Sequence, residues 1–349
     1  MFYNLNNMSG PNLHIIKDTK IIFLLFLTVI LIPFSARSQT KEAIAKQGEG
    51  IYRLLTRNGL PPEKYLNAFI EINQERLGPG NMLFAGRKYL LPDKSETGEI
   101  KTSKNILNLD IFGKNYSKVE IISNQLNGAV YHLMAGHGGP DPGAVGKYEG
   151  RLLCEDEYAY DVTLRLARNL IQNGATVYMI TIDANDGIRD DNYLKPDKNE
   201  KCYPNHTIPI NQLRRLKQRT YAVNSLYKKH RGQFQRMIAI HLDSRSHSEN
   251  IDVFYYHDQR SEKGKKAARI LQSTFQEKYD THQPGRGYRG TVSSRNLYVV
   301  RNTIPVAIYI ELGNINHQRD QQRFIYPNNR QALANWLTEG LITDFKTNK

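Results

Sequence analysis

The stretch Val306-Ala307-Ile308-Tyr309-Ile310-Glu311 is an apolar run, rich in β-branched residues, that ends on a carboxylate. Two other apolar runs also lead to a polar residue: Ile238-Ala239-Ile240 to His241, and 129–134 to a Gly-His-Gly-Gly loop that carries His137. Short apolar runs of this kind are typical of strands buried in a parallel sheet. Because parallel strands of one polarity end at the same edge of a sheet, the three polar residues are predicted to converge there.

Strand and helix patterns alternate through residues 118–349. Strands are expected at 119–122, 129–134, 176–181, 237–241, 252–256, 296–301 and 306–311, and helices at 156–173, 212–229, 262–278 and 330–345. This alternation predicts an α/β fold with a mostly parallel sheet covered by helices on both faces.

A fourth polar residue, Glu155, stands at the head of the helix expected at 156–173. Two imidazoles and one carboxylate form a ligand set that catalytic zinc uses, with a fourth position left for water. His137, Glu155 and His241 are therefore candidate zinc ligands, and Glu311 is the spare carboxylate that would move protons. Each residue also has an ordinary reading, since a lone histidine is usually structural and a first-turn carboxylate suits the positive end of a helix.

Longer motifs surround these residues. The loop 136–144 reads Gly-His-Gly-Gly-x-Asp-Pro-Gly-Ala, and Glu311 is followed by Leu-Gly-Asn-Ile. In this combination, from residue 128 to the C-terminus, the chain resembles the Amidase_3 family of zinc-dependent N-acetylmuramoyl-L-alanine amidases. The resemblance implies an amidase/phosphorylase-like fold, Zn²⁺ held by His137, Glu155 and His241, and Glu311 as the catalytic residue.

The activity implied by this resemblance is hydrolysis of the amide between the lactyl group of N-acetylmuramic acid and the L-alanine of the stem peptide in peptidoglycan. The segment 298–303 resembles a further family motif, and Asp243, Arg301 and Asn302 are expected to contact substrate. Where the family has Ala-Asn after the third ligand, this chain has Leu242-Asp243. The hydrogen bonds around that ligand are therefore expected to differ.

Three other readings stay open from the sequence. The same fold could bind the wall without cutting it, or act as a zinc carboxypeptidase within the stem peptide. A serine hydrolase ranks below both, because the chain has no Gly-x-Ser-x-Gly motif. Dependence on an activator protein is not decided by the sequence.

The N-terminus has the features of a secretory signal peptide. Lys17 and Lys20 precede an apolar stretch at 21–34, and small residues follow up to residue 38. This stretch is shorter than the roughly 20 apolar residues that span a bilayer, so residues 1–38 are predicted to be removed. We expect the mature protein to have no stable membrane span and to work in the periplasm or in the cell wall outside the cell.

The chain is basic, with 48 Lys and Arg against 34 Asp and Glu and a formal charge of +14 over 349 residues. The charges are scattered without a stripe of basic and aromatic residues, which argues against a nucleic-acid partner. Weak attraction to anionic wall polymers is one interpretation, and an ordinary solvated surface is the other.

Residues 45–92 are predicted to form a small βααβ module that resembles LysM, which binds N-acetylglucosamine-containing glycans. The segment 48–52 supplies the usual opening, and a Leu-x-x-Gly turn at 83–86 precedes the Leu-Pro ending at 91–92. A structural helical hairpin is the alternative. Residues 93–117 are expected to be a flexible linker that would raise the effective concentration of the domain at 118–349 on its polymer.

The polar segment 183–211 is expected to lie at the surface beside the site, because its composition offers little apolar surface for a core element. It contains Cys202, and the other cysteine of the chain, Cys154, adjoins Glu155. An oxidising compartment would permit a disulfide between them, and the sequence leaves both states open.

Overall fold

A computed structural model of the chain describes residues 41–46, 49–78, 81–93 and 106–348. The predicted signal peptide lies outside these residues. The chain divides into two compact units, one within residues 1–100 and one within 101–349. In the part of the chain that is described, no helix has the length and apolarity needed to cross a membrane.

The first unit has the order strand, helix, helix, strand. Its elements are β1 (Glu42–Ile44), α1 (Ile51–Arg57), α2 (Pro62–Ile72), the short 3-10 helix η1 (Gln74–Arg76) and β2 (Lys88–Leu90), with β1 antiparallel to β2. Leu54, Leu55 and Phe69 of the helices pack with Tyr89 of β2 in its core. The buried amide of Asn73 joins α2 to β2, because it donates to the Phe69 and Leu90 carbonyls and accepts from the Leu90 amide. The first strand lies ahead of residue 45, where the sequence placed the start of the module.

A six-stranded sheet forms the centre of the second unit, in the order β14-β13-β15-β12-β5-β8. The strands are β5 (Ala129–Ala135), β8 (Thr176–Met179), β12 (Phe234–Asp243), β13 (Phe254–His257), β14 (Thr291–Ser294) and β15 (Val306–Asn314). Strands β8, β5, β12 and β15 are parallel to one another. Strand β13 is antiparallel to β15, and β14 is parallel to β13. The expectation of a mostly parallel sheet is confirmed.

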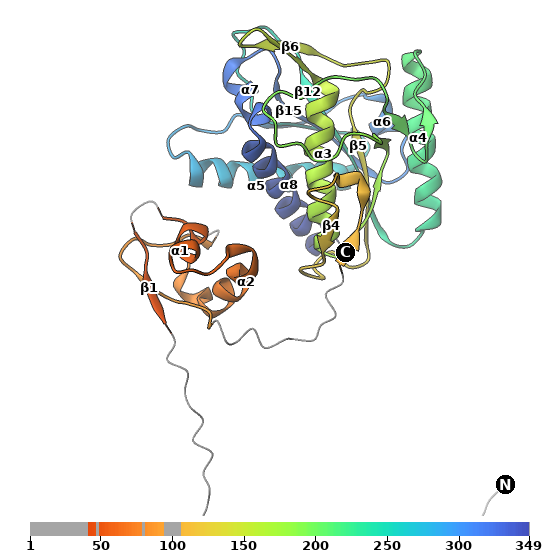
Figure 1. Cartoon of the computed structure of the whole chain (residues 1–349). Coiled ribbons are helices and arrows are strands. Elements are labelled where there is room, and N and C mark those ends of the chain that lie inside the picture. The colour runs from red at the N-terminus through yellow and green to blue at the C-terminus, as the bar shows by residue number, and fades with distance from the viewer. Residues whose placement is uncertain (1–40, 47–48, 79–80, 94–105, 349) are drawn as a thin grey trace, which may run out of the picture. The chain divides into compact units, whose positions relative to one another are not determined.

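Helices cover both faces of this sheet (Figure 1). One face carries α3 (Glu155–Gln172), α5 (Glu262–His282), α7 (Gln318–Ile325) and α8 (Pro327–Asn348), and the other carries α4 (Gln212–Lys229) and α6 (Tyr298–Asn302). Alternate residues of β12 feed the two cores: Ile238 and Ile240 pack with the α3 side, Met237 and Ala239 with the α4 side. By the same alternation, His241 projects toward the α4 side.

Three expectations from the sequence are wrong in detail. Residues 296–301, expected as a strand, contain the start of α6, whose Val299 and Val300 are buried on the α4 side of the sheet. The strand expected at 119–122 is β4 (Lys118–Glu120), which pairs with β3 (Ile106–Asn108) outside the main sheet. Residues 106–117 are therefore not linker: they include β3 and the 3-10 helix η3 (Asp110–Phe112), and Phe112 is buried in the main core.

The polar segment 183–211 also contributes to the core, contrary to expectation. Ile188 and Leu194 join the main cluster, while Cys202 and Ile208 join the cluster on the α4 side. The segment contains β10 (Lys201–Cys202) and β11 (His206–Thr207), which extend from β9 (Thr181–Ile182) as a small antiparallel sheet. These few apolar residues are enough to anchor the segment, because Arg189 and Asp190 form ion pairs with Glu157 and Arg165 of α3. Cys154 and Cys202 are free, buried thiols, and burial raises the pKa of each to about 11.

Candidate metal centre

His137, Glu155 and His241 come together at the carboxyl edge of the sheet. Each offers a ligand atom, and these atoms lie within 4.8 Å of one another. His137 follows the end of β5, Glu155 begins α3, and His241 is near the end of β12. The β6 (Val145–Tyr148) and β7 (Arg151–Cys154) hairpin brings the chain from the histidine loop to the head of α3.

Two glycines make this convergence possible. A side chain on Gly136 would stand 2.4 Å from the His241 ring, and one on Gly143 would stand 2.6 Å from Glu155 Oε2 and 2.7 Å from the His137 ring. Gly143 also has a φ of 70°, and His137 itself adopts a φ of 56°, a region that side chains other than glycine rarely occupy. The Gly-rich loop therefore serves close approach of the candidate ligands.

The Glu155 carboxylate faces both imidazoles. Its Oε1 is 2.8 Å from His241 Nδ1 and its Oε2 is 3.2 Å from His137 Nε2. The Leu242 and Ala144 amides donate to the same carboxylate at 3.1 and 2.8 Å. Burial by itself would raise the pKa of Glu155, but the hydrogen bonds from His137 and His241 outweigh it and hold the pKa well below the usual range. Glu155 is thus an anion at neutral pH, as a metal ligand must be.

Asp141 orients His137 from the side away from Glu155. Its Oδ2 is 2.9 Å from His137 Nδ1 and also accepts from Arg215 of α4. The hydrogen bond with His137 lowers the pKa of Asp141 to about 2. Burial alone would lower the pKa of His137, yet the hydrogen bonds to Asp141 and Glu155 raise it to about 10. A carboxylate that fixes the ring of a metal-binding histidine is a recurrent arrangement, and the sequence motif had not revealed this role for Asp141.

Glu311 lies beside His241, because the two are register partners in the parallel pair β12 and β15. The neighbouring Tyr309 stacks on the His241 ring with 4.2 Å between centroids. Glu311 is buried, and its Oε2 has no hydrogen-bond partner among the described residues. Burial, followed by the charges of Glu155 and Asp243, raises the pKa of Glu311 well above its ordinary value. Such a carboxylate has a strong tendency to take up a proton.

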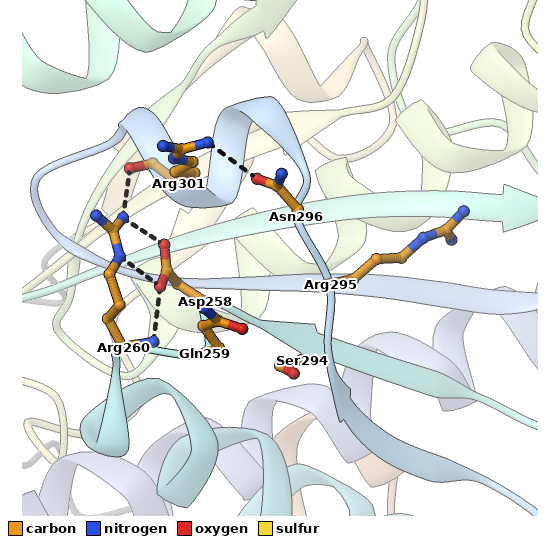
Figure 2. A pocket seen from close by; sticks show the side chains of 7 residues that line it. All are labelled: Asp258, Gln259, Arg260, Ser294, Arg295, Asn296 and Arg301. Carbon is orange, nitrogen blue, oxygen red and sulfur yellow. Dashed lines mark hydrogen bonds and ion pairs between the residues drawn. The ribbon is translucent and has the colours of Figure 1, made fainter.

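Of the other three residues singled out in the sequence, Asp243 lies next to the centre, whereas Arg301 and Asn302 lie before the start of β15, and Glu311 lies toward the other end of that strand. Asp243, two residues after His241, accepts from Arg245 Nε at 2.7 Å. Arg301 and Asn302 are on α6, and Arg301 lines a cavity of about 270 Å³ together with Arg260 and Arg295 (Figure 2). In the described part of the chain, no hydrogen bond or ion pair connects Arg301 or Asn302 to the three candidate ligands. Their contact with substrate stays a prediction.

Arg295 was not singled out in the sequence, although its charge reaches the site. Its guanidinium lies 5.1 Å from the centroid of the Tyr256 ring, and Tyr256 is the register partner of Tyr309. The positive charge of Arg295 opposes the rise in the pKa of Glu311. Nothing in the local sequence Ser-Arg-Asn distinguishes this arginine, because the contact depends on how β13 and β14 are placed.

A family model described as N-acetylmuramoyl-L-alanine amidase, Amidase_3, matches residues 132–343, more than half of the chain. The matched range contains both imidazoles, both carboxylates and most of the sheet that positions them. The chain belongs to the Amidase_3 family.

The chain has low sequence identity to individual relatives of known name or structure. The chain is 27% identical over 241 residues to the probable cell wall amidase LytH of Staphylococcus aureus, covering 67% of this chain and 63% of that protein. It therefore spans less than two thirds of the length of that relative. The N-acetylmuramoyl-L-alanine amidase from Clostridium difficile 630 is 20% identical with a TM-score of 0.47, covering 64% of this chain and 100% of that one. The CwlD amidase from Clostridioides difficile, solved in complex with the GerS lipoprotein, is 17% identical with a TM-score of 0.47, covering 63% and 99%.

Proposed function

We propose that this chain is an exported, zinc-dependent N-acetylmuramoyl-L-alanine amidase that cleaves the amide between N-acetylmuramic acid and the L-alanine of the stem peptide in peptidoglycan. The observation that carries the proposal is the placement of buried Glu311 next to the His137, Glu155 and His241 cluster. Membership of the Amidase_3 family supports the choice of bond. Export rests on the signal-like residues 1–38.

The donor set fits zinc. Two neutral imidazoles and a carboxylate form a ligand set that catalytic zinc sites use. The anionic state of Glu155 suits this role, as does the contact between His137 Nδ1 and the Asp141 carboxylate. When bound, zinc supplies Lewis acidity toward a carbonyl oxygen and makes water easier to deprotonate. His137 has to lose the proton that its raised pKa favours before it can serve as a ligand.

In this proposal Glu311 moves the proton. Its carboxylate takes the proton from water as the water oxygen forms a bond to the carbonyl carbon. It then gives that proton to the alanine nitrogen as the carbon–nitrogen bond breaks. The buried, unpaired Oε2 of Glu311 and its raised pKa suit a group that is neutral in one half of the reaction and anionic in the other.

Mass spectrometry of the products tests the bond that is cut. With purified muropeptides, the amidase is expected to release peptides with a free L-alanine amino terminus and sugars without peptide. Shortened stem peptides still attached to sugar would identify a carboxypeptidase instead. If the zinc-loaded protein binds sacculi but releases no peptide from them, the chain is a wall-binding protein that does not cut its ligand.

The first unit is proposed to be a LysM-like module that holds the enzyme on the glycan. Its strand–helix–helix–strand order with antiparallel β1 and β2 is the arrangement such a module requires. The second unit has its own sheet and its own core, so it is expected to fold without the first.

Deleting residues 41–92 is therefore expected to weaken binding to intact sacculi while kcat/KM on small soluble muropeptides changes less than about twofold. The reason is that a separate binding module adds effective concentration on the polymer and none of the chemistry. Cosedimentation with sacculi and assays on soluble substrate measure the two quantities. If the full chain and the deletion variant cosediment with sacculi equally, the first unit has a structural role and does not bind the glycan.

A further inference from the structure

A second group of carboxylates lies next to the candidate zinc centre. Asp156 and Glu157 follow Glu155 in the first turn of α3, and Glu200 comes from the segment 183–211. The three residues are only 2%, 2% and 4% exposed, and one carboxylate oxygen of each lies within 4.8 Å of the others. Neither the proposed amidase chemistry nor the zinc ligand set uses any of them.

The contacts of these carboxylates leave much of their charge uncompensated. Glu157 pairs with Arg189 Nη1 at 2.8 Å and accepts from the Asp197 amide at 2.8 Å, but Arg189 is shared with Asp186. Glu200 accepts backbone amide hydrogen bonds, from Gly139 at 2.6 Å and from its own amide. Within the described ranges, neither Asp156 nor Glu200 has an ion-pair partner.

Asp156 gives the independent sign of a missing partner. Its Oδ1 accepts from the Glu157 amide at 3.0 Å, whereas its Oδ2 is buried and has no hydrogen-bond partner among the residues that the structure describes. An unpaired buried carboxylate oxygen is costly, and two further carboxylates nearby increase the cost. A cation among the three would remove it.

We propose that Asp156, Glu157 and Glu200 bind a divalent cation of the calcium class, separate from the zinc centre. Three carboxylates without nitrogen or sulfur donors suit a hard cation. Calcium is favoured over magnesium because magnesium usually keeps several of its water molecules, for which a site this buried has little room.

Such an ion would join three parts of the fold. It would connect the first turn of α3, which carries Glu155, to the segment 183–211. Through the hydrogen bond from Gly139 to Glu200, it would also hold the loop that carries His137. The cation would therefore link the segments of the chain that carry two candidate zinc ligands, His137 and Glu155.

The test uses the full chain loaded with zinc and freed of other metals. Calorimetric titration with calcium chloride is expected to show about one site per chain and a rise in the unfolding temperature, with magnesium binding more weakly. Asp156→Asn and Glu200→Gln, singly and together, should weaken calcium binding about tenfold or more. Because neither residue belongs to the three-residue donor cluster, zinc content after loading should equal that of the parent. Asp280→Asn, the same change at an exposed position of α5, is the matched control and should bind like the parent.

A further variant separates this site from the zinc centre. His241→Ala removes a proposed zinc ligand and should still bind calcium. Absence of calcium, magnesium and manganese binding at millimolar concentration would overturn the proposal and leave the cluster neutralised by protons. Unchanged binding by the double variant, or an Asp156→Asn chain that is more stable than the parent even in saturating calcium, would overturn it as well.

Discussion

Glu311→Gln is expected to lower turnover by about 10²–10⁴-fold, the usual contribution of a group that transfers protons in catalysis. Glutamine has nearly the same shape as glutamate, so β15 and its register with β12 should be preserved. It cannot accept a proton, and therefore only the transfer step is removed. Because Glu311 is not a member of the three-residue donor cluster, zinc content should remain that of the parent.

His241→Ala supplies the contrast for this prediction. It removes one of the three donors, so zinc content and activity are expected to fall together. Metal analysis after dialysis and dye release from labelled sacculi measure both properties. If Glu311→Gln retained more than about a tenth of the turnover, or if it lost its zinc, Glu311 would not be the proton-transfer residue.

The parts of the site that could be predicted are those set by short-range pattern. His241 and Glu311 each sit at the end of an apolar run, and because parallel strands end at the same edge of a sheet, the two residues were predicted to converge there. In the structure they are register partners. The family motif added Glu155, which the pattern alone could not separate from an ordinary first-turn carboxylate.

The parts that were missed depend on contacts between distant segments. The role of Asp141 requires Arg215 of α4, and that of Arg295 requires Tyr256 of β13. A short run such as 296–301 fits a strand or a helix equally well, and burial of Val299 and Val300 decides for the helix.

The segment 183–211 was misjudged for a related reason. Its composition is polar, but its charged residues find partners on α3: Arg189 pairs with Glu157, and the Arg189 amide donates to Asp161. The sequence does not reveal these ion pairs, which help to hold the segment against α3 although it has few apolar residues to bury.

The same network leads to a prediction of a large loss of stability. Arg330 of α8 is fully buried, and its Nε donates to Asp161 Oδ2 at 2.6 Å. Its other nitrogens donate to the carbonyls of Phe324 and Ile325 at the end of α7, and to those of Arg189 and Asp191 in the polar segment. One guanidinium thus joins α3, α7, α8 and the segment 183–211.

Arg330→Met is expected to lower the free energy of unfolding of the second unit by about 3–5 kcal/mol, because it leaves a buried carboxylate with less compensation and removes the donor from the carbonyls of Phe324, Ile325 and Asp191. Trp336, the single tryptophan of the chain, lies on α8, so its fluorescence during urea unfolding reports on this unit alone. Arg269→Met, at an exposed position of α5, is the matched control and should change the value by less than about 0.5 kcal/mol. Arg165 also binds Asp161, at 2.8 Å, and would keep that carboxylate partly compensated, which places the loss for Arg330→Met at the lower end of the range. Equal midpoints for Arg330→Met and Arg269→Met would mean that the segment 183–211 is held by its apolar residues and not by this arginine.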